Sequence, residues 1–200
     1  MAQGSGDVAG FRVGVVEADK LIDGSEIRVG DSIIGIASSG LHSNGFSLAR
    51  RVLFDEGKLH PDQQIEAIEQ TIGLELLKPT RIYVKSILNI IKNFRIRGIV
   101  HITGGGFIDN IPRILPGPCR AVIRAGSWPV LPVFELIQKM GNIDLVEMLR
   151  VFNMGIGMMI IVAEKDHIEI MERLEKLGET AYSIGIIEKR ENDQPAVSFV

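Results

Sequence analysis

Two glycine-rich segments hold the residues of this sequence that are best suited to bind an anion. The first reads SSGLHSNG at positions 38–45, and the second reads TGGG at positions 103–106. Glycines let backbone N–H groups approach an oxyanion closely, and serine and threonine hydroxyls add neutral donors. Each segment leads into a stretch with helical spacing, whose N-terminus would add partial positive charge. Together the segments predict a site for a phosphate group or a polar sugar, although such turns also serve tight packing alone.

The candidate ligand-binding residues come from these two segments and from the end of one later helix. They are Ser38, Ser39, Gly40, Ser43, Asn44, Gly45, Thr103, Gly104, Gly105, Gly106 and Asn153. Asn153, like Arg150 before it, either faces a ligand or caps the end of that helix.

His42 is the candidate catalytic residue, because the pKa range of histidine suits proton transfer near neutral pH. A loop histidine held by hydrogen bonds is an equally good interpretation. His101 falls inside an apolar run, which favours a core position over a catalytic one. Thr80 is suited to cap the helix that follows it. Arg81 either reaches an anion or lies in solvent at the start of that helix.

Known nucleotide and hydrolase motifs are incomplete in this sequence. No Lys-Ser or Lys-Thr follows TGGG at 103–106, and Asp109 stands where a dinucleotide-binding loop has its last glycine. Leu41 replaces the first glycine of a nucleophile elbow. Since no set of His, Cys and Glu has metal-ligand spacing, the sequence predicts no metal ligands.

Short apolar runs alternate with helical patterns along the chain. Strands are expected at 8–16, 32–37, 98–103, 121–124, 155–163 and 182–188, and the longer helices at 46–54, 81–93, 130–140 and 166–178. Such alternation predicts an α/β domain with a mixed sheet covered by helices. Ligands of α/β sheets tend to bind beyond the carboxyl ends of strands, which is where both glycine-rich segments fall.

The composition is that of an ordinary globular domain. The chain has 200 residues, of which 46% are hydrophobic, and a formal net charge of −3. This charge argues against nucleic-acid binding. No apolar run approaches the roughly 20 residues of a membrane span. Because Cys119 is the one cysteine, no internal disulfide can form, which favours a cytoplasmic protein.

Several segments resemble the aminoimidazole ribonucleotide synthetases, also called phosphoribosylformylglycinamidine cyclo-ligases. They are GDSIIGIASSGLHSNGFSLARRVL at 30–53, LLKPTRIYVKSIL at 76–88, HITGGGFIDNIPRILP at 101–116 and EMLRVFNMGIGM at 147–158. GDVAGFRVGVVE at 6–17 is similar to that family's entry into its second domain. The matches follow one another over nearly the whole chain. One departure is Val151, where the family more often has threonine.

The resemblance implies a ligase of purine biosynthesis. Its members phosphorylate the formyl oxygen of formylglycinamidine ribonucleotide with ATP and then close the imidazole ring. The family's second domain is an α/β/α unit, partly ferredoxin-like, with the substrate cleft between the two domains. ATP and Mg²⁺ are expected to be handled mainly by the N-terminal domain, which has no counterpart here. Related ATP-dependent enzymes with other substrates, such as thiamine monophosphate kinase, share this plan.

The resemblance also implies the domain boundaries. Residues 1–6 are small and polar and are for that reason expected to be a leader or a cloning scar, whereas the resemblance implies that residues 7–200 are the C-terminal, substrate-side domain. We expect such a domain alone to lack synthetase activity. The alternative is a stand-alone, non-catalytic module that binds a metabolite or docks a partner. A domain without its partner is also expected to expose an apolar face, through which a homo-oligomer could form.

Overall fold

A computed structural model describes residues 10, 11 and 13–200 of the chain. The leader predicted at 1–6 lies outside these residues, as does part of the strand predicted at 8–16. The described residues of that segment form no strand, and the side chains of Phe11, Val13 and Val15 are exposed. This strand prediction is therefore wrong for the residues described, because an extended apolar segment needs a neighbouring strand to become part of a sheet.

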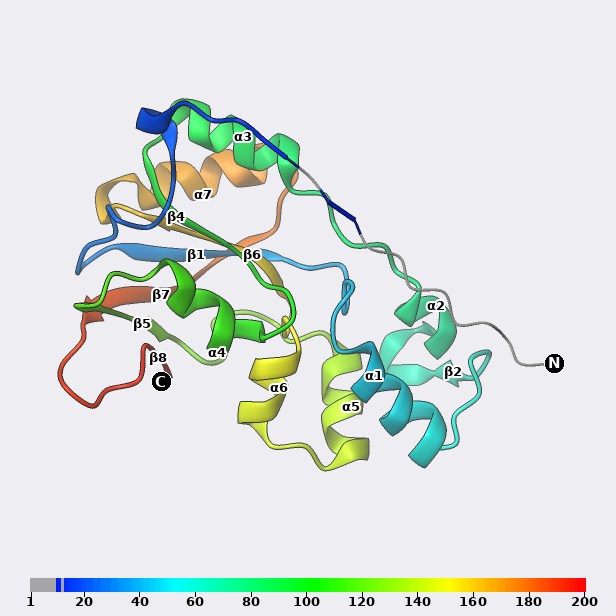
Figure 1. Cartoon of the computed structure of the whole chain (residues 1–200). Helices are drawn as coiled ribbons and strands as arrows, with labels where there is room; N and C mark the ends of the chain where they lie inside the picture. Colours follow the sequence, from blue (N-terminus) through cyan, green and yellow to red (C-terminus); the bar gives the residue numbers. More distant parts are fainter. Residues whose placement is uncertain (1–9, 12) are drawn as a thin grey trace.

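A six-stranded mixed sheet forms the centre of the molecule (Figure 1). Its strands are β1 (Ser32–Ala37), β4 (Ile96–His101), β5 (Cys119–Ile123), β6 (Ile156–Val162), β7 (Ala181–Lys189) and β8 (Val197–Phe199). They lie in the order β4-β6-β1-β7-β5-β8, and each neighbouring pair is antiparallel except β5 and β8. A separate small hairpin pairs β2 (Gln64–Ile65) with β3 (Gln70–Thr71).

Helices cover both faces of the sheet. The α-helices are α1 (Phe46–Arg50), α2 (Ile72–Leu76), α3 (Val84–Asn93), α4 (Gly106–Asn110), α5 (Pro132–Gly141), α6 (Leu145–Val151) and α7 (His167–Lys176). A π-helical turn, η2 (Arg51–Glu56), continues α1, and short 3-10 turns are η1 (Ala18–Lys20), η3 (Glu66–Ile68), η4 (Ile111–Ile114) and η5 (Glu164–Asp166). The predicted α/β class, with a mixed sheet covered by helices, is confirmed.

The order of four strands explains the expected likeness to ferredoxin. The chain forms the units β1-α3-β4 and β6-α7-β7, and their strands interleave in the sheet as β4-β6-β1-β7. This interleaving of two split βαβ units is the ferredoxin-like arrangement. In this chain β5 and β8 extend the sheet beyond it.

Two apolar cores result, one on each face of the sheet. In β1, Ile34 packs into the core beneath α3 and α7, whereas Ile33 packs into the larger core beneath α4, α5 and α6. Neighbouring residues of a strand point to opposite faces, so a strand covered on both sides needs a continuous apolar run. The run at 32–37 was predicted as a buried strand for this reason, and it coincides with β1.

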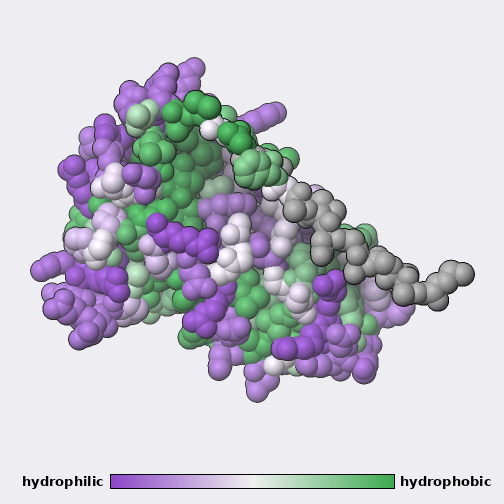
Figure 2. Space-filling model, viewed as in Figure 1, coloured by the Kyte–Doolittle hydropathy of each residue, from purple (hydrophilic) through white to green (hydrophobic). Residues whose placement is uncertain are grey.

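An exposed apolar surface lies on and beside α3, and we call it the α3 surface. Its members are Ile82, Val84, Leu88 and Ile91, which are 80%, 59%, 60% and 37% exposed. Figure 2 shows hydrophobic residues gathered over this part of the molecule. The expected apolar face is therefore present. Across the described residues, no helix combines the length and apolar character needed to cross a membrane.

Candidate functional site

The two glycine-rich loops lie together at one edge of the sheet. The loop at 38–45 follows β1 and leads into α1, and the loop at 103–106 follows β4 and leads into α4. Because β1 and β4 both run antiparallel to β6, they end at the same edge. A Cβ atom placed on Gly104 would lie 3.8 Å from Oδ1 of Asn44. The fold thus brings together the two segments that the sequence analysis singled out.

Asn153 fixes the shape of the first loop from within the protein. Its buried side chain accepts hydrogen bonds at Oδ1 from Ser38 Oγ, at 3.0 Å, and from the Gly155 backbone N–H, at 2.8 Å. Its Nδ2 donates to the Gly40 carbonyl oxygen at 2.9 Å. Since Ser38 and Asn153 are both buried and bonded to each other, the structure gives them a supporting place behind the loop. Direct ligand contact by either remains a prediction.

His42 holds the same loop to a second segment of the chain. Its backbone is left-handed, with φ of 58°, and its side chain is buried. Its Nε2 accepts hydrogen bonds from the backbone N–H groups of Ser39, at 3.1 Å, and Arg81, at 3.4 Å. Burial, aided by the nearby His101 and Arg81, lowers the pKa of His42 to about 4. The ring is therefore neutral at pH 7, with its proton on Nδ1, and its acceptor atom is already engaged.

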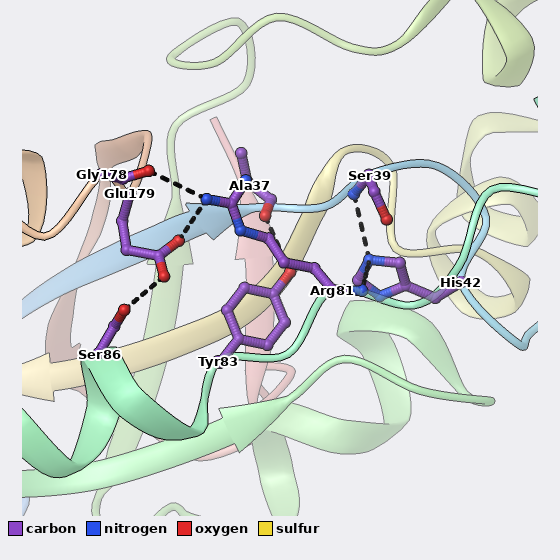
Figure 3. Close-up of polar contacts among 8 residues, drawn as sticks. All are labelled: Ala37, Ser39, His42, Arg81, Tyr83, Ser86, Gly178 and Glu179. Carbon is purple, nitrogen blue, oxygen red and sulfur yellow. Dashed lines mark hydrogen bonds and ion pairs between the residues drawn. The ribbon is translucent and has the colours of Figure 1, made fainter.

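The Arg81 side chain is anchored by a buried carboxylate (Figure 3). Arg81 Nη2 lies 2.8 Å from Glu179 Oε2 and donates to the Gly178 carbonyl oxygen at 3.1 Å. Ser86 Oγ donates to Glu179 Oε1 at 2.5 Å. Arg81 therefore does not lie free in solvent. The backbone N–H that it presents to His42 is held in place by these contacts.

The outer part of the first loop remains accessible. Ser43 is exposed, and its Oγ lies 3.1 Å from Thr80 Oγ1. Ser39 Oγ donates to the Pro79 carbonyl oxygen at 2.7 Å. Thr80 does not cap α3, which begins at Val84 instead. That cap prediction is wrong because residues 79–83 run along the loop and the sheet before the helix starts.

The second loop is shaped by Asn110, a residue that the sequence analysis did not select. Its buried Nδ2 donates to the carbonyl oxygens of Thr103 and Gly104, each at 3.2 Å, and of Gly106, at 2.8 Å. Within the described part of the chain, the backbone N–H groups of Gly104 and Gly105 have no hydrogen-bond partner. The available signal was the position of Asn110, one helical turn beyond the third glycine.

Gly106 and Gly45 are required by the backbone and by close packing. Gly106 has φ of 53°, and a Cβ there would overlap the Leu149 carbonyl oxygen. Gly45 has φ of 75°, and a Cβ there would overlap the ring of Phe152. Only glycine combines left-handed backbone with so little space, so both loops are tied to α6 and the segment after it.

Trp128 connects α4 with the segment that enters β6. Its Nε1 donates to the Met154 carbonyl oxygen at 2.9 Å, and its ring stacks on Phe107 with 5.6 Å between centroids. Phe107 belongs to α4, and Met154 precedes β6. This buried indole thus joins the helix after the second loop to the strand entry that holds Asn153.

His101 differs from its prediction, because it ends β4 and is exposed rather than part of the core. Its ring lies 6.4 Å from that of Tyr83, and partial burial lowers its pKa. Alternation along the strand explains the outcome. Val100 points into the larger core. The side chain of its neighbour, His101, therefore points to the opposite face of the sheet, where Tyr83 lies.

The arrangement is suited to bind an anionic or polar ligand through neutral donors. Asn44 lies opposite Gly104 across the two loops, Ser43 is exposed on the first loop, and the N–H groups of Gly104 and Gly105 have no partner among the described residues. The described residues include no group of three or more His, Cys, Asp or Glu placed to hold a metal ion. Magnesium bound to a nucleotide therefore finds no carboxylate cluster on this part of the chain.

The sequence matches known proteins over nearly its whole length. A family described as AIR synthase related protein, C-terminal domain, matches residues 28–198. The phosphoribosylformylglycinamidine cyclo-ligase of Syntrophus aciditrophicus is 62% identical over 96% of this chain, and that of Brevibacillus brevis is 51% identical over 95%. The chain spans 56% and 55% of the lengths of these two relatives.

Solved structures share the fold at low sequence identity. Thiamine-monophosphate kinase from Stenotrophomonas maltophilia superposes with a TM-score of 0.60 at 17% identity, over 92% of this chain and 54% of its own. The hydrogenase maturation protein HypE of E. coli gives a TM-score of 0.56 at 18% identity, over 88% of this chain and 47% of its own.

Proposed function

Because the chain belongs to the AIR synthase related proteins, as their C-terminal domain, we propose that it forms the substrate-side part of a phosphoribosylformylglycinamidine cyclo-ligase. Such an enzyme closes the imidazole ring of aminoimidazole ribonucleotide in purine biosynthesis. The observation that carries the proposal for this chain is the meeting of the 38–45 and 103–106 loops at one edge of the sheet. The 62% identity to a protein with that name supports the choice of reaction.

The proposed ligand is formylglycinamidine ribonucleotide, and its phosphate and ribose would contact the accessible donors. These are the Ser43 hydroxyl, the Asn44 amide and the backbone N–H groups of Gly104 and Gly105. Backbone N–H groups in a glycine-rich turn suit phosphate oxygens without a cation nearby. Five further residues would determine the backbone path of the two loops around the ligand. They are Ser39, Gly40, Gly45, Thr103 and Gly106.

The buried residues would act on the ligand through these loops. Asn153 and Ser38 support the first loop, and Asn110 supports the second. His42 is proposed in the orienting role, because a neutral ring that already accepts two N–H groups fixes the loop at pH 7. To act in proton transfer, His42 would have to release the two N–H groups that its Nε2 accepts.

The remaining part of the longer proteins would supply the ATP chemistry. When bound, ATP would supply the phosphoryl group that turns the formyl oxygen into a leaving group, and Mg²⁺ would neutralise charge on its phosphates. We place this chemistry on the N-terminal domain because the chain spans only 56% of the length of the Syntrophus aciditrophicus relative. That domain would dock on the α3 surface, which also offers a route to a homo-oligomer. We expect the enzyme in the cytoplasm, where its free, buried Cys119 stays reduced.

Calorimetric titration of the pure chain tests the proposal. We expect formylglycinamidine ribonucleotide to bind and ATP with Mg²⁺ not to bind. Asn44→Ala should weaken ribonucleotide binding about tenfold, because it removes one polar contact of roughly 1–1.5 kcal/mol. Asn192→Ala, in an exposed turn far along the chain, serves as the matched control. Equal affinity of the two variants would place the ligand elsewhere. Ring closure by the pure chain would refute the proposal that the N-terminal domain supplies the ATP chemistry.

A further inference from the structure

Gly157 lies in β6 at a break in its pairing with β1. Ile36 pairs with Met158 and Ala37 pairs with Ile156, so the register passes over Gly157. Its carbonyl oxygen accepts a hydrogen bond from the Ile102 N–H at 2.9 Å, immediately before the 103–106 loop. Such bulges bend a strand locally and are common beside functional sites. Gly157 thus contacts Ile102, which immediately precedes the second loop. The position that its Cβ would occupy faces His42 of the first loop.

The space that a side chain at Gly157 would fill is already occupied. A Cβ atom there would overlap the Tyr83 hydroxyl and would lie 2.5 Å from Cε1 of His42. No heavy atom can remain that close without moving. The requirement for glycine comes from this space alone, because its φ lies outside the left-handed range.

Neither neighbour of Gly157 can withdraw without breaking hydrogen bonds. The Tyr83 hydroxyl donates to the Ala37 carbonyl oxygen at 2.8 Å, and burial raises the pKa of this phenol. The His42 ring holds two backbone N–H groups, those of Ser39 and Arg81. A methyl group at position 157 would therefore push the His42 ring away from at least one of them.

We propose that Gly157 is a positioning residue of the site. Because Gly157 has no side chain, it leaves a space, here called the seat, in which the His42 ring lies. The seat holds the 38–45 loop beside the 103–106 loop. The inference rests on the proposed function only where it regards these loops as a ligand site. The seat itself follows from contacts among Gly157, His42 and Tyr83. Sequence reasoning could not find it, because Gly157 lies inside an apolar run that reads simply as a strand.

Gly98 provides a matched control within the same sheet. A Cβ there would lie 2.8 Å from Cδ1 of Ile114 and 2.9 Å from Cδ1 of Ile27. These atoms are the ends of flexible apolar side chains, which can shift without losing a hydrogen bond. Replacing Gly98 with alanine therefore adds a methyl group to the sheet without disturbing the His42 ring.

The test records nitrogen spectra of the ¹⁵N-histidine-labelled chain as a function of pH, for the wild type, Gly157→Ala and Gly98→Ala. In the wild type and in Gly98→Ala, we expect neutral His42 with its proton on Nδ1 and a pKa near 4. In Gly157→Ala, we expect the pKa of His42 to rise by at least one unit toward the ordinary 6.5, with the tautomers mixed. An unchanged tautomer and pKa in folded Gly157→Ala would overturn the proposal.

A second variant covers the case in which Gly157→Ala does not fold. Removal of the ring in His42→Ala should relieve the part of the overlap that falls on His42, while the overlap with the Tyr83 hydroxyl remains. The double variant His42→Ala/Gly157→Ala should therefore lose less in Tm, relative to His42→Ala, than Gly157→Ala loses relative to the wild type. Equal losses in the two backgrounds would overturn the seat.

Titration with formylglycinamidine ribonucleotide separates this inference from the proposed function. We expect Gly157→Ala to weaken binding at least tenfold while Gly98→Ala binds as the wild type does. A displaced His42 ring with unchanged affinity would overturn the positioning role. If even the wild type fails to bind while the spectra change as expected, the proposed function falls and the seat remains.

Discussion

The side-chain amide of Asn153 donates a 2.9 Å hydrogen bond to the carbonyl oxygen of Gly40, which lies 113 positions earlier in the chain. This bond spans the sheet edge between the end of α6 and the loop after β1. Its partners are buried, so neither can turn to water if the other is lost. The shape of the 38–45 loop is therefore set by a residue remote from it in sequence.

Asn153→Asp should destabilise the fold by about 2–3 kcal/mol, because it removes one donor to the Gly40 carbonyl oxygen and places a carboxylate at a fully buried position. Urea unfolding measures the change. Asn192→Asp, at an exposed position, provides the control and should stay within about 0.5 kcal/mol of the wild type. A loss no larger than that of the control would contradict the supporting role of Asn153.

The stability of the chain should fall between pH 6.5 and about pH 4 because of His42. Its folded pKa of about 4 lies below the ordinary 6.5, so in this window the unfolded chain binds a proton that the folded chain excludes. The contribution is complete above pH 6.5, is lost as the pH falls, and amounts to about 3 kcal/mol at most. His101 and His167, whose pKa values burial also lowers, add in the same direction.

Comparison with His42→Gln isolates this contribution. Glutamine keeps an acceptor for the N–H groups but does not titrate, so the pH dependence of its unfolding free energy should be shallower. Both proteins are measured by urea unfolding at several pH values between 4 and 7.5. Identical slopes would mean that His42 titrates normally in the folded chain.

Arg81→Met should cost about 2 kcal/mol, because it leaves the buried carboxylate of Glu179 without its cation. The full cost of breaking a buried pair is reduced here, since the Arg81 side chain is 32% exposed. Arg150→Met is the control, because the pair of Arg150 with Glu147 is 3.6 Å apart and half exposed on both sides. Its loss should be below about 0.5 kcal/mol. Similar unfolding midpoints for the two variants would show that the Arg81–Glu179 pair stabilises the fold no more than the exposed Arg150–Glu147 pair does.

Leu88→Glu should suppress self-association of the chain, because it places a charge in the middle of the α3 surface. Ile168→Glu, on α7, is a suitable control because Ile168 is 71% exposed and lies outside this surface. Sedimentation velocity at increasing concentration measures the outcome. We expect the wild type and Ile168→Glu to associate and Leu88→Glu to remain monomeric. A wild type that stays monomeric throughout would contradict an adhesive role for this surface.

Sequence patterns were reliable where burial alone decides the structure. The run SIIGIA at 32–37 coincides with β1, and the strand expected at 182–188 is contained in β7. Residues covered on both faces must be apolar, so little else competes with this signal. Both glycine-rich loops were also located correctly, because consecutive glycine and hydroxyl residues after an apolar run mark the end of a strand.

Patterns failed where a distant contact decides the structure. Helical spacing from Arg81 onward suggested a helix beginning there, yet Arg81 and Tyr83 are engaged by Glu179 and Ala37. The partners of His42 and Asn153 are likewise set by the fold rather than by local spacing. The alternating Phe11, Val13 and Val15 have strand propensity, but the described residues offer them no neighbouring strand.

Trp128 makes the site observable by light without any label. It is the one tryptophan of the chain, and it is buried between the helix after the second loop and the entry to β6. Its fluorescence emission should therefore be blue-shifted and should come from a single place. Movement of α4 or of the segment at Met154 changes the surroundings of this one indole, so ligand-linked shifts of either element become optical signals on the timescale of a stopped-flow measurement.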